Sequence, residues 1–244
     1  MSDQTKPPEH ALDAERLELY RERGYVELGP FLSLDELVEL REIVDQLYTD
    51  ANQGPFELAT GEGSYTLFTP VFTKSKRYAE LLHRHPVLLD ILESILGPVF
   101  RLVEDQVFYK PARHGAPLAF HHDNVYYGFP DPQIVTCWIA LDDATPQNGC
   151  LQILPGSHRA EIEHRGIPGS IIREAVFDHA GLVEVTAKAG DLVIIDGLTV
   201  HGSGPNTTDT PRRVANLVAI VPCADGVGRK FSDAENPYLR GVPA

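Results

Sequence analysis

The order of the predicted elements indicates an α+β fold in which β-structure dominates. Helical periodicity is confined to residues 1–98. About eight short segments rich in Val, Ile, Phe and Tyr follow, separated by clusters of Gly, Pro, Asn and Asp. Short strands punctuated in this way predict a β-sandwich or barrel. Helices followed by strands are typical of segregated α+β folds rather than of doubly wound sheets.

The N-terminal segment predicts a helix, a strand and a second helix. Leu12–Arg23 is expected to be helical and to stop at Gly24, and Tyr25–Leu28 is expected to be a short strand. Ser33 opens the second helix, since Glu36 three residues later completes a capping box. The apolar residues of this helix recur at helical spacing, so one face packs on a core; they are Leu37, Leu40, Val44 and Leu47.

A long loop and a third helix complete the N-terminal part. Gln53–Thr73 is rich in Gly, Pro and Thr, and a loop of this length is either functional or mobile. Pro86 is a favoured first-turn residue and begins the third helix, which stops at Gly97-Pro98. We expect a single domain, 1–244, divided into a mostly helical part with a loop (1–98), a β-core (99–222) and a C-terminal tail (223–244).

The predicted strands all follow residue 98. Each is short and apolar, and turn-forming residues separate it from the next. The segments are Val99–Val103, Gln106–Lys110, Phe120–Asp123, Ile134–Leu141, Leu151–Leu154, Leu182–Thr186, Leu192–Ile195 and Val214–Val221.

Composition and charge exclude several classes of function. The 244 residues carry 21 Lys and Arg against 35 Asp and Glu, a formal net charge of −14. A broad basic surface for nucleic acid or for an anionic membrane is therefore not expected, and no apolar run reaches the roughly 18–20 residues that span a bilayer. Cys137, Cys150 and Cys223 form no CxxC pair, which predicts a reducing, cytoplasmic setting with Cys137 and Cys150 buried.

One histidine–acid triplet indicates a metal site. Side chains alternate faces along a strand, so His121 and Asp123 point the same way within Phe120–Asp123, and His122 points the other way. An imidazole and a carboxylate on one face, with a third ligand, form the facial triad that suits non-haem Fe(II). His201 follows an apolar strand and begins a turn-rich stretch, which makes it the candidate third ligand. Taken alone, a His-x-Asp triplet is a weak signal, because it arises by chance in a chain with ten histidines.

Arg212 strengthens the metal-site hypothesis. It follows His201 by eleven residues, at the start of the next predicted strand. From there a guanidinium could enter the same barrel and bind a carboxylate bidentately. The alternative is a surface salt bridge, and the adjacent Arg213 predicts that one of the two arginines lies on the surface.

Three motifs together resemble the phytanoyl-CoA dioxygenase family. They are His121-His122-Asp123, the segment NGCLQILPGSH from Asn148 to His158, and His201-Gly202-Ser203 followed by Arg212. Gly24–Leu28 is also similar to the family's N-terminal entry, so the resemblance covers residues 11–222. It implies a double-stranded β-helix (a cupin-like jelly roll) with the N-terminal helices packed outside. It also implies an Fe(II)- and 2-oxoglutarate-dependent dioxygenase that consumes O2.

The resemblance assigns a role to each candidate residue. His121, Asp123 and His201 would hold the iron, and Arg212 would pair with the distal carboxylate of 2-oxoglutarate. Three further residues would contact this cosubstrate: Ser203, Trp138 and Gln106.

Two histidines fall outside these assignments. The segment that ends at His158 resembles a structural turn and strand, so His158 is not expected to bind iron. The family often has Gln where this chain has His122, which leaves the role of His122 open.

Hydroxylation of a small molecule is the expected reaction. Related halogenases have a small residue where this chain has Asp123, and a carboxylate fills the position that chloride would take. The loop Gln53–Thr73 is expected at the mouth of the site. Four side chains are candidate substrate contacts: Lys110, Tyr126, Tyr127 and Phe129.

Two other functions remain open on the sequence. A cupin-like isomerase or hydrolase could use the same ligands with zinc or manganese and would not need Arg212. A non-catalytic barrel could bind a small molecule without turnover. The identity of the substrate, the regio- and stereochemistry, the choice among hydroxylation, desaturation, epoxidation and ring chemistry, and the oligomeric state are not determined by the sequence.

Overall fold

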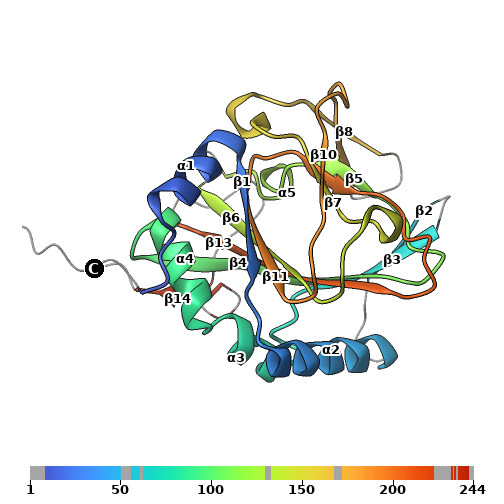
Figure 1. Ribbon diagram of the computed structural model, residues 1–244, viewed down its shortest axis with the longest axis horizontal. Helices are drawn as coiled ribbons and strands as arrows, with labels where there is room; N and C mark the ends of the chain where they lie inside the picture. The colour runs from blue at the N-terminus through green and yellow to red at the C-terminus, as the bar shows by residue number, and fades with distance from the viewer. Residues whose placement is uncertain are drawn as a thin grey trace, which may run out of the picture.

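Two antiparallel sheets lie face to face in this computed structural model (Figure 1). The structure describes residues 9–50, 56–60, 63–129, 133–167, 172–222, 232, 234 and 236–241. Its strands are β1 (Tyr25–Pro30), β2 (Phe56–Thr60), β3 (Gly63–Phe68), β4 (Phe100–Lys110), β5 (Leu118–His121), β6 (Ile134–Ala140), β7 (Leu151–Ile153), β8 (His164–Gly166), β9 (Arg173–Ala175), β10 (Val183–Val185), β11 (Asp191–Asp196), β12 (His201–Ser203), β13 (Arg212–Ile220) and β14 (Tyr238–Arg240). The larger sheet has the order β1-β11-β6-β13-β4-β3-β2 with β14 beside β4, and the smaller has the order β10-β7-β12-β5.

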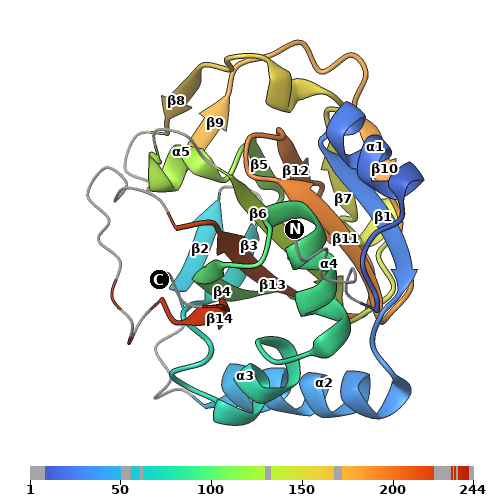
Figure 2. The same cartoon turned by 90° about the vertical axis from the view of Figure 1, so that its left-hand side faces the viewer.

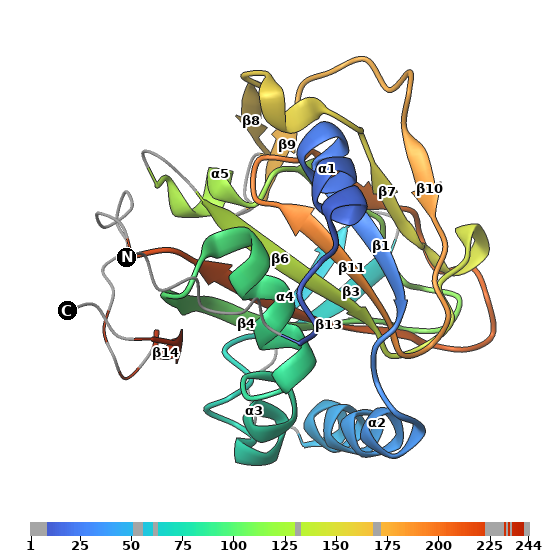
Figure 3. The ribbon, with the colours of Figure 1, turned by 60° about the vertical axis from the view of Figure 1, so that its left-hand side comes forward.

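Four of the described helices cover the outside of the larger sheet: α1 (Ala14–Arg23), α2 (Leu34–Thr49), α3 (Lys76–Leu82) and α4 (Pro86–Leu96). The short α5 (Asn124–Tyr127) lies on the cavity side instead. One apolar cluster joins α2, α3 and α4 to the strands behind them (Figures 2 and 3). Gly24 ends α1 with a left-handed φ of 78°, and Ser33 and Glu36 form the predicted capping box of α2. The predicted mainly β fold with external helices is therefore confirmed.

Strand β6 illustrates how the core is divided into two layers. All seven of its residues are buried, and alternate side chains face opposite sides of the sheet. Cys137 and Ile139 belong to the cluster shared with the helices. Trp138 and Ala140 belong to the cluster between the two sheets. A strand covered on both faces is almost continuously apolar, and this burial places Trp138 inside the barrel.

The prediction of a loop over Gln53–Thr73 is largely wrong, because most of the described residues in this segment belong to strands. β2 and β3 pair with each other, and β3 joins the larger sheet by pairing with β4, where Leu67 lies opposite Phe108. The Gly, Pro and Thr content of the segment suggested a loop. Its partner strand lies some forty residues later in the chain, so local sequence gave no sign of the pairing.

Several other elements differ from the predicted ones. Val99–Val103 and Gln106–Lys110 are halves of the single strand β4, which carries a bulge where its pairing with β13 shifts register. Helix α3, which begins after the N-cap Ser75, was not predicted. The short strands β8, β9 and β14 were also missed, because three residues are too few to show an apolar period.

Two predictions about the setting of the chain have different outcomes. Cys137 and Cys150 are buried free thiols, as expected, and Cys223 lies outside the described residues. Over the described ranges, none of the helices has the length and apolar character that crossing a membrane requires. The cytoplasmic location stays a prediction.

Candidate metal centre and cosubstrate pocket

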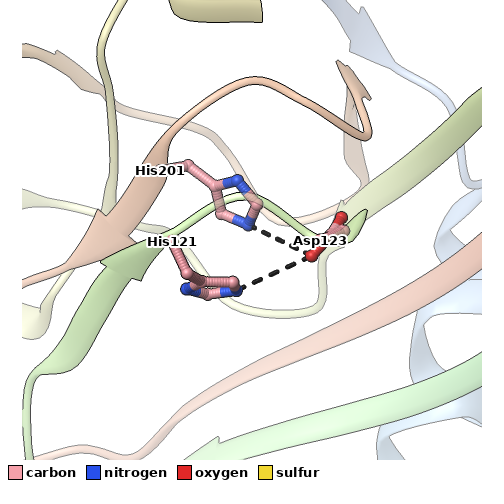
Figure 4. Close-up of side chains that lie close together, drawn as sticks. All are labelled: His121, Asp123 and His201. Atoms are coloured by element: carbon pink, nitrogen blue, oxygen red, sulfur yellow. Dashed lines mark ion pairs between the residues drawn. The ribbon is translucent and has the colours of Figure 1, made fainter. Parts of the chain in front are cut away.

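The two histidines of the predicted triad meet across a pair of strands. His121 is the last residue of β5 and His201 is the first residue of β12, and the two are direct partners in the antiparallel pairing. Their ring centroids lie 4.6 Å apart. Figure 4 shows both imidazoles pointing toward the carboxylate of Asp123. Residues eighty positions apart in the chain are thus brought together by the sheet.

Asp123 reaches this point by a different route from the one predicted. β5 ends at His121, and Asp123 has helical backbone angles (φ −60°, ψ −38°) immediately before α5. The expected alternation along one strand is therefore wrong, although the side chain still joins the histidines. The chain turns here because the Nδ1 of His122 accepts a hydrogen bond from the backbone N–H of Val125 at 3.1 Å. This contact also gives His122 a structural role, and its ring packs against the ring of His164.

Hydrogen bonds orient both imidazoles so that the Nε2 atom of each faces the carboxylate of Asp123. The Nδ1 of His121 lies 2.8 Å from the carbonyl of Ala119, and the Nδ1 of His201 lies 2.9 Å from the carbonyl of Thr199. Because a carbonyl only accepts, each Nδ1 carries the proton and each Nε2 has a lone pair. Such support from a carbonyl is typical of metal-binding histidines.

The ligand atoms are close enough to share one ion. The Oδ1 of Asp123 lies 3.6 Å from the Nε2 of His121 and 3.7 Å from the Nε2 of His201. One ligand atom from each of the three residues lies within 4.8 Å of the others. Within the described residues, no other group of His, Cys, Asp and Glu meets this criterion.

The protonation states also suit a cation. Burial by itself would raise the pKa of Asp123, but His201, His121 and the hydroxyl of Thr136 lower it well below its usual value. Burial lowers the pKa of His201. The group therefore presents a carboxylate and a neutral imidazole at neutral pH, which are the forms that bind metals.

A cavity of about 260 Å³ opens beside the triad. Strands β4 and β13 line it with alternate residues, since paired residues in an antiparallel ladder face the same side. Gln106, Asn216 and Trp138 form one row across β4, β13 and β6. Lys110 and Arg212 form another. The cavity is near the lower end of the usual size range for small-molecule sites.

Arg212 occupies this cavity, as the sequence predicted. Its side chain is buried, and its Nη2 donates to the carbonyl of Gly149 at 2.8 Å. Its Nε is buried and has no hydrogen-bond partner within the described part of the chain. A buried guanidinium with an unused N–H is costly unless an acceptor binds there, so the observation fits an anionic ligand at this position.

Arg213 faces the opposite side of β13. Its guanidinium bonds Asp142 at 2.8 Å and Asp45 of α2 at 2.7 Å. It was expected at the surface, but only 12% of its side chain is exposed, because α2 covers this face. Because side chains alternate along the strand, Arg213 forms structural ion pairs on one face and Arg212 lines the cavity on the other.

The remaining candidates divide between the cavity and the core. The cavity is lined by Gln106, Trp138, Ser203, Lys110, Tyr126 and Tyr127. Phe129, also expected to contact the substrate, is not among the residues that line this cavity. Its ring is buried against Val103, Tyr127 and Ile134, as expected of an aromatic residue that stabilises a core.

Asn216 is a cavity residue that sequence reasoning missed. Its side chain is buried, and its Oδ1 has no hydrogen-bond partner among the residues that the structure describes. It lies four residues after Arg212 in one strand, and therefore on the same face. Applying the two-residue period onward from Arg212 would have identified it.

The Asn148–His158 segment supports the site without binding to it. Gly149 has a left-handed φ of 79°, and a Cβ at this position would lie 2.3 Å from the carbonyl of Gly204. The hydroxyl of Ser157 accepts a hydrogen bond at 2.8 Å from Val200, the residue before His201. His158 contacts the carbonyl of Arg21 and lies outside the triad, in agreement with its predicted structural role.

Comparison with known proteins agrees with this arrangement. A probable alpha-ketoglutarate-dependent hypophosphite dioxygenase of Stutzerimonas stutzeri is 27% identical over 226 residues, covering 82% of this chain and 76% of that protein. Phytanoyl-CoA dioxygenase 1 of Oryza sativa subsp. japonica is 25% identical over 281 residues and covers 97% of both. The solved structure of SnoN, a non-heme alpha ketoglutarate dependent epimerase from nogalamycin biosynthesis, aligns with a TM-score of 0.76 at 25% identity. The alignment covers 93% of this chain and 98% of SnoN.

A jelly roll with a two-histidine, one-carboxylate group is typical of non-haem iron oxygenases. A family model for phytanoyl-CoA dioxygenase (PhyH) matches residues 20–214. This chain therefore belongs to the phytanoyl-CoA dioxygenase family. The predicted family, the jelly roll, and iron and 2-oxoglutarate as the cofactors of this class are confirmed.

Proposed function

We propose that this protein is an Fe(II)- and 2-oxoglutarate-dependent dioxygenase that hydroxylates an unactivated C–H bond of a small molecule. One observation carries the proposal: a His–Asp–His group shares a cavity with a buried arginine whose Nε has no acceptor among the described residues. A cupin-like isomerase or hydrolase would account for the first feature but not for the second.

The side chains have separate tasks in this proposal. The Nε2 atoms of His121 and His201 and the carboxylate of Asp123 hold the iron, in the orientation set by their second hydrogen bonds. Arg212 binds the distal carboxylate of 2-oxoglutarate. Three neighbours that line the cavity orient the rest of the cosubstrate: Ser203, Gln106 and Trp138. Bound iron and 2-oxoglutarate supply the O2 activation, with succinate and CO2 as products.

Asp123 favours hydroxylation over halogenation, because its carboxylate takes the coordination position that a halide would need. Epimerisation is the second candidate, since the epimerase SnoN aligns over almost its full length. The substrate is a small molecule, as in relatives named for hypophosphite and ectoine. Tyr126 and Tyr127, in the cavity wall beside Asp123, are the proposed contacts.

Incubation of the iron-loaded protein with 2-oxoglutarate, O2 and a panel of small molecules tests the proposal. We expect succinate release that requires O2 and a product that has gained one oxygen atom. A product of unchanged mass and inverted configuration would favour epimerisation. Turnover with zinc in the absence of 2-oxoglutarate would replace the proposal with the cupin-like alternative, and binding without any succinate release would favour the non-catalytic barrel.

A further inference from the structure

Two buried cations lie side by side at one end of the cavity. Lys110 ends β4 and Arg212 begins β13, and the two residues are direct partners in the antiparallel pairing. Their exposed fractions are only 2% and 3%. Directly opposed residues have Cβ atoms about 5 Å apart, and like charges at such positions destabilise a sheet. The pair therefore has an electrostatic cost that needs an explanation.

Among the residues that the structure describes, the groups that accept hydrogen bonds from these cations are neutral. The Nζ of Lys110 donates to the carbonyl of Gly204, and Arg212 donates to the carbonyl of Gly149. Neither residue forms an ion pair with the acidic groups that the structure describes; Asp142, the carboxylate that acts on Arg212 electrostatically, pairs with Arg213. A buried charge without a counterion is unfavourable. In keeping with this, burial and the neighbouring guanidinium lower the pKa of Lys110, and burial lowers the pKa of Arg212 to about 10.

The two carbonyl acceptors belong to loops that touch each other. Gly149 comes so close to Gly204 that a Cβ on Gly149 would lie 2.3 Å from the carbonyl oxygen of Gly204. The two acceptors therefore lie close together, and both cations line the cavity. An anion that entered from the triad side would meet both cations at once.

We propose that Lys110 is a second cosubstrate-binding residue, whose ammonium binds the distal carboxylate of 2-oxoglutarate together with Arg212. This inference rests on the proposed function. The proposal counts Lys110 as a cosubstrate contact and no longer as a substrate contact, because its strand partner is Arg212, the residue proposed to bind the distal carboxylate. The end of the cavity then selects a 2-oxo acid that carries a carboxylate at its far end.

Lys110→Gln tests this role, because it removes the charge and keeps an N–H donor for the carbonyl of Gly204. Calorimetric titration of the Mn(II)-loaded protein would compare 2-oxoglutarate with 2-oxobutyrate, which lacks the distal carboxylate. We expect Lys110→Gln to weaken 2-oxoglutarate binding at least about tenfold and to leave 2-oxobutyrate binding unchanged. Lys110→Arg, which keeps the charge, should retain more of the affinity than Lys110→Gln. Lys188→Gln is the matched control, since the side chain of Lys188 is 81% exposed.

The inference is overturned if folded Lys110→Gln binds 2-oxoglutarate as tightly as the native protein, or if both ligands weaken equally. If Lys110→Gln fails to fold, Lys110→Arg decides the question. A lysine that only bonds the carbonyl of Gly204 gives no reason for a retained charge to preserve 2-oxoglutarate binding. An Arg212→Gln variant separates the two proposals. Loss of binding in Arg212→Gln but not in Lys110→Gln contradicts only the role of Lys110, whereas no binding by the native protein contradicts the proposed function itself.

Discussion

Each proposed metal ligand makes a second hydrogen bond that holds it in place. The carbonyls of Ala119 and Thr199 hold the two imidazoles, and the hydroxyl of Thr136 donates to the Oδ2 of Asp123. The last contact leaves Oδ1 facing the histidines. The orientation of the carboxylate therefore depends on a residue that would not touch the metal.

Replacing Thr136 with valine removes this hydroxyl at nearly constant volume. We expect the metal affinity of Thr136→Val to be about 10- to 100-fold lower, which is the usual effect of losing a hydrogen bond to a metal ligand. Asp123→Ala, which removes a proposed ligand, should abolish turnover. Competition with a chelator measures the affinity. Thr207→Val is the control, since the hydroxyl of Thr207 bonds the carbonyl of Gln147 at the surface. An unchanged affinity in Thr136→Val would remove Thr136 from the support of the metal centre.

The two adjacent arginines allow a matched comparison. Arg212→Gln should raise the KM for 2-oxoglutarate roughly 30-fold or more, because losing one partner of a buried charge pair costs about 2–5 kcal/mol. Arg213→Gln should lower the melting temperature, through loss of the pairs with Asp142 and Asp45, and leave this KM unchanged. Equal effects on KM would contradict the separation of the two faces.

At the residue scale, sequence singled out side chains that the structure brings together where a local period or a family motif applied, and their metal-binding role stays a prediction. The motifs identified His121, Asp123 and His201 by family likeness. The backbone route of Asp123 was wrong, because the turn depends on the His122 side chain bonding the N–H of Val125. Such a contact forms only after the strand has ended, so strand alternation could not predict it.

At the scale of elements, the turn that follows β7 holds the beginning of β12. The hydroxyl of Ser157 accepts from Val200, and the hydroxyl of Thr199 donates to the carbonyl of Gly24 at the end of α1. His201 follows directly. The position of one metal ligand therefore depends on three segments that are distant in the chain.

Ser157→Ala leaves the buried N–H of Val200 without its acceptor, at a cost of about 1–3 kcal/mol. We expect a lower melting temperature together with weaker metal binding. Ser33→Ala, which removes the N-cap of α2 and costs about 1 kcal/mol, should lower the melting temperature alone. Thermal unfolding and metal titration of both variants measure the difference. Metal binding as tight in Ser157→Ala as in Ser33→Ala would show that this turn does not position His201.

Element boundaries were predicted best where a cap or breaker marks them. The capping box at Ser33 and the glycine at Gly24 are examples. The pairing of β3 with β4 was missed, since it depends on residues far away in the chain. The single strand β4 was predicted as two strands, with the acidic pair Glu104-Asp105 left out between them.

At the scale of the molecule, the larger sheet separates stability from chemistry. Its outer face packs against α2, α3 and α4, and its inner face lines the cavity. The family and the jelly roll could be predicted because their motifs are local. The substrate could not, because the cavity wall combines residues from β3, β4, α5, β7 and β12 whose relative positions only the fold defines.

Ligand binding should stabilise the whole chain. With Mn(II) and 2-oxoglutarate each at about a hundred times its dissociation constant, each ligand adds about 2.7 kcal/mol, and the two together add about 5 kcal/mol. For a chain of this size that corresponds to a rise in melting temperature of roughly 10–20 °C. Differential scanning calorimetry measures it, with Asp123→Ala as the control that should not respond. An equal rise in that variant would indicate binding elsewhere.

The central claim is that His121, Asp123 and His201 hold one iron to which 2-oxoglutarate binds. Anaerobic titration with Fe(II) and 2-oxoglutarate tests it most directly, because the ternary complex has a weak charge-transfer band in the visible range. We expect the band to need both ligands, to saturate at one iron per chain and to be absent from Asp123→Ala. No band from the native protein, or an undiminished band from the variant, would contradict the claim.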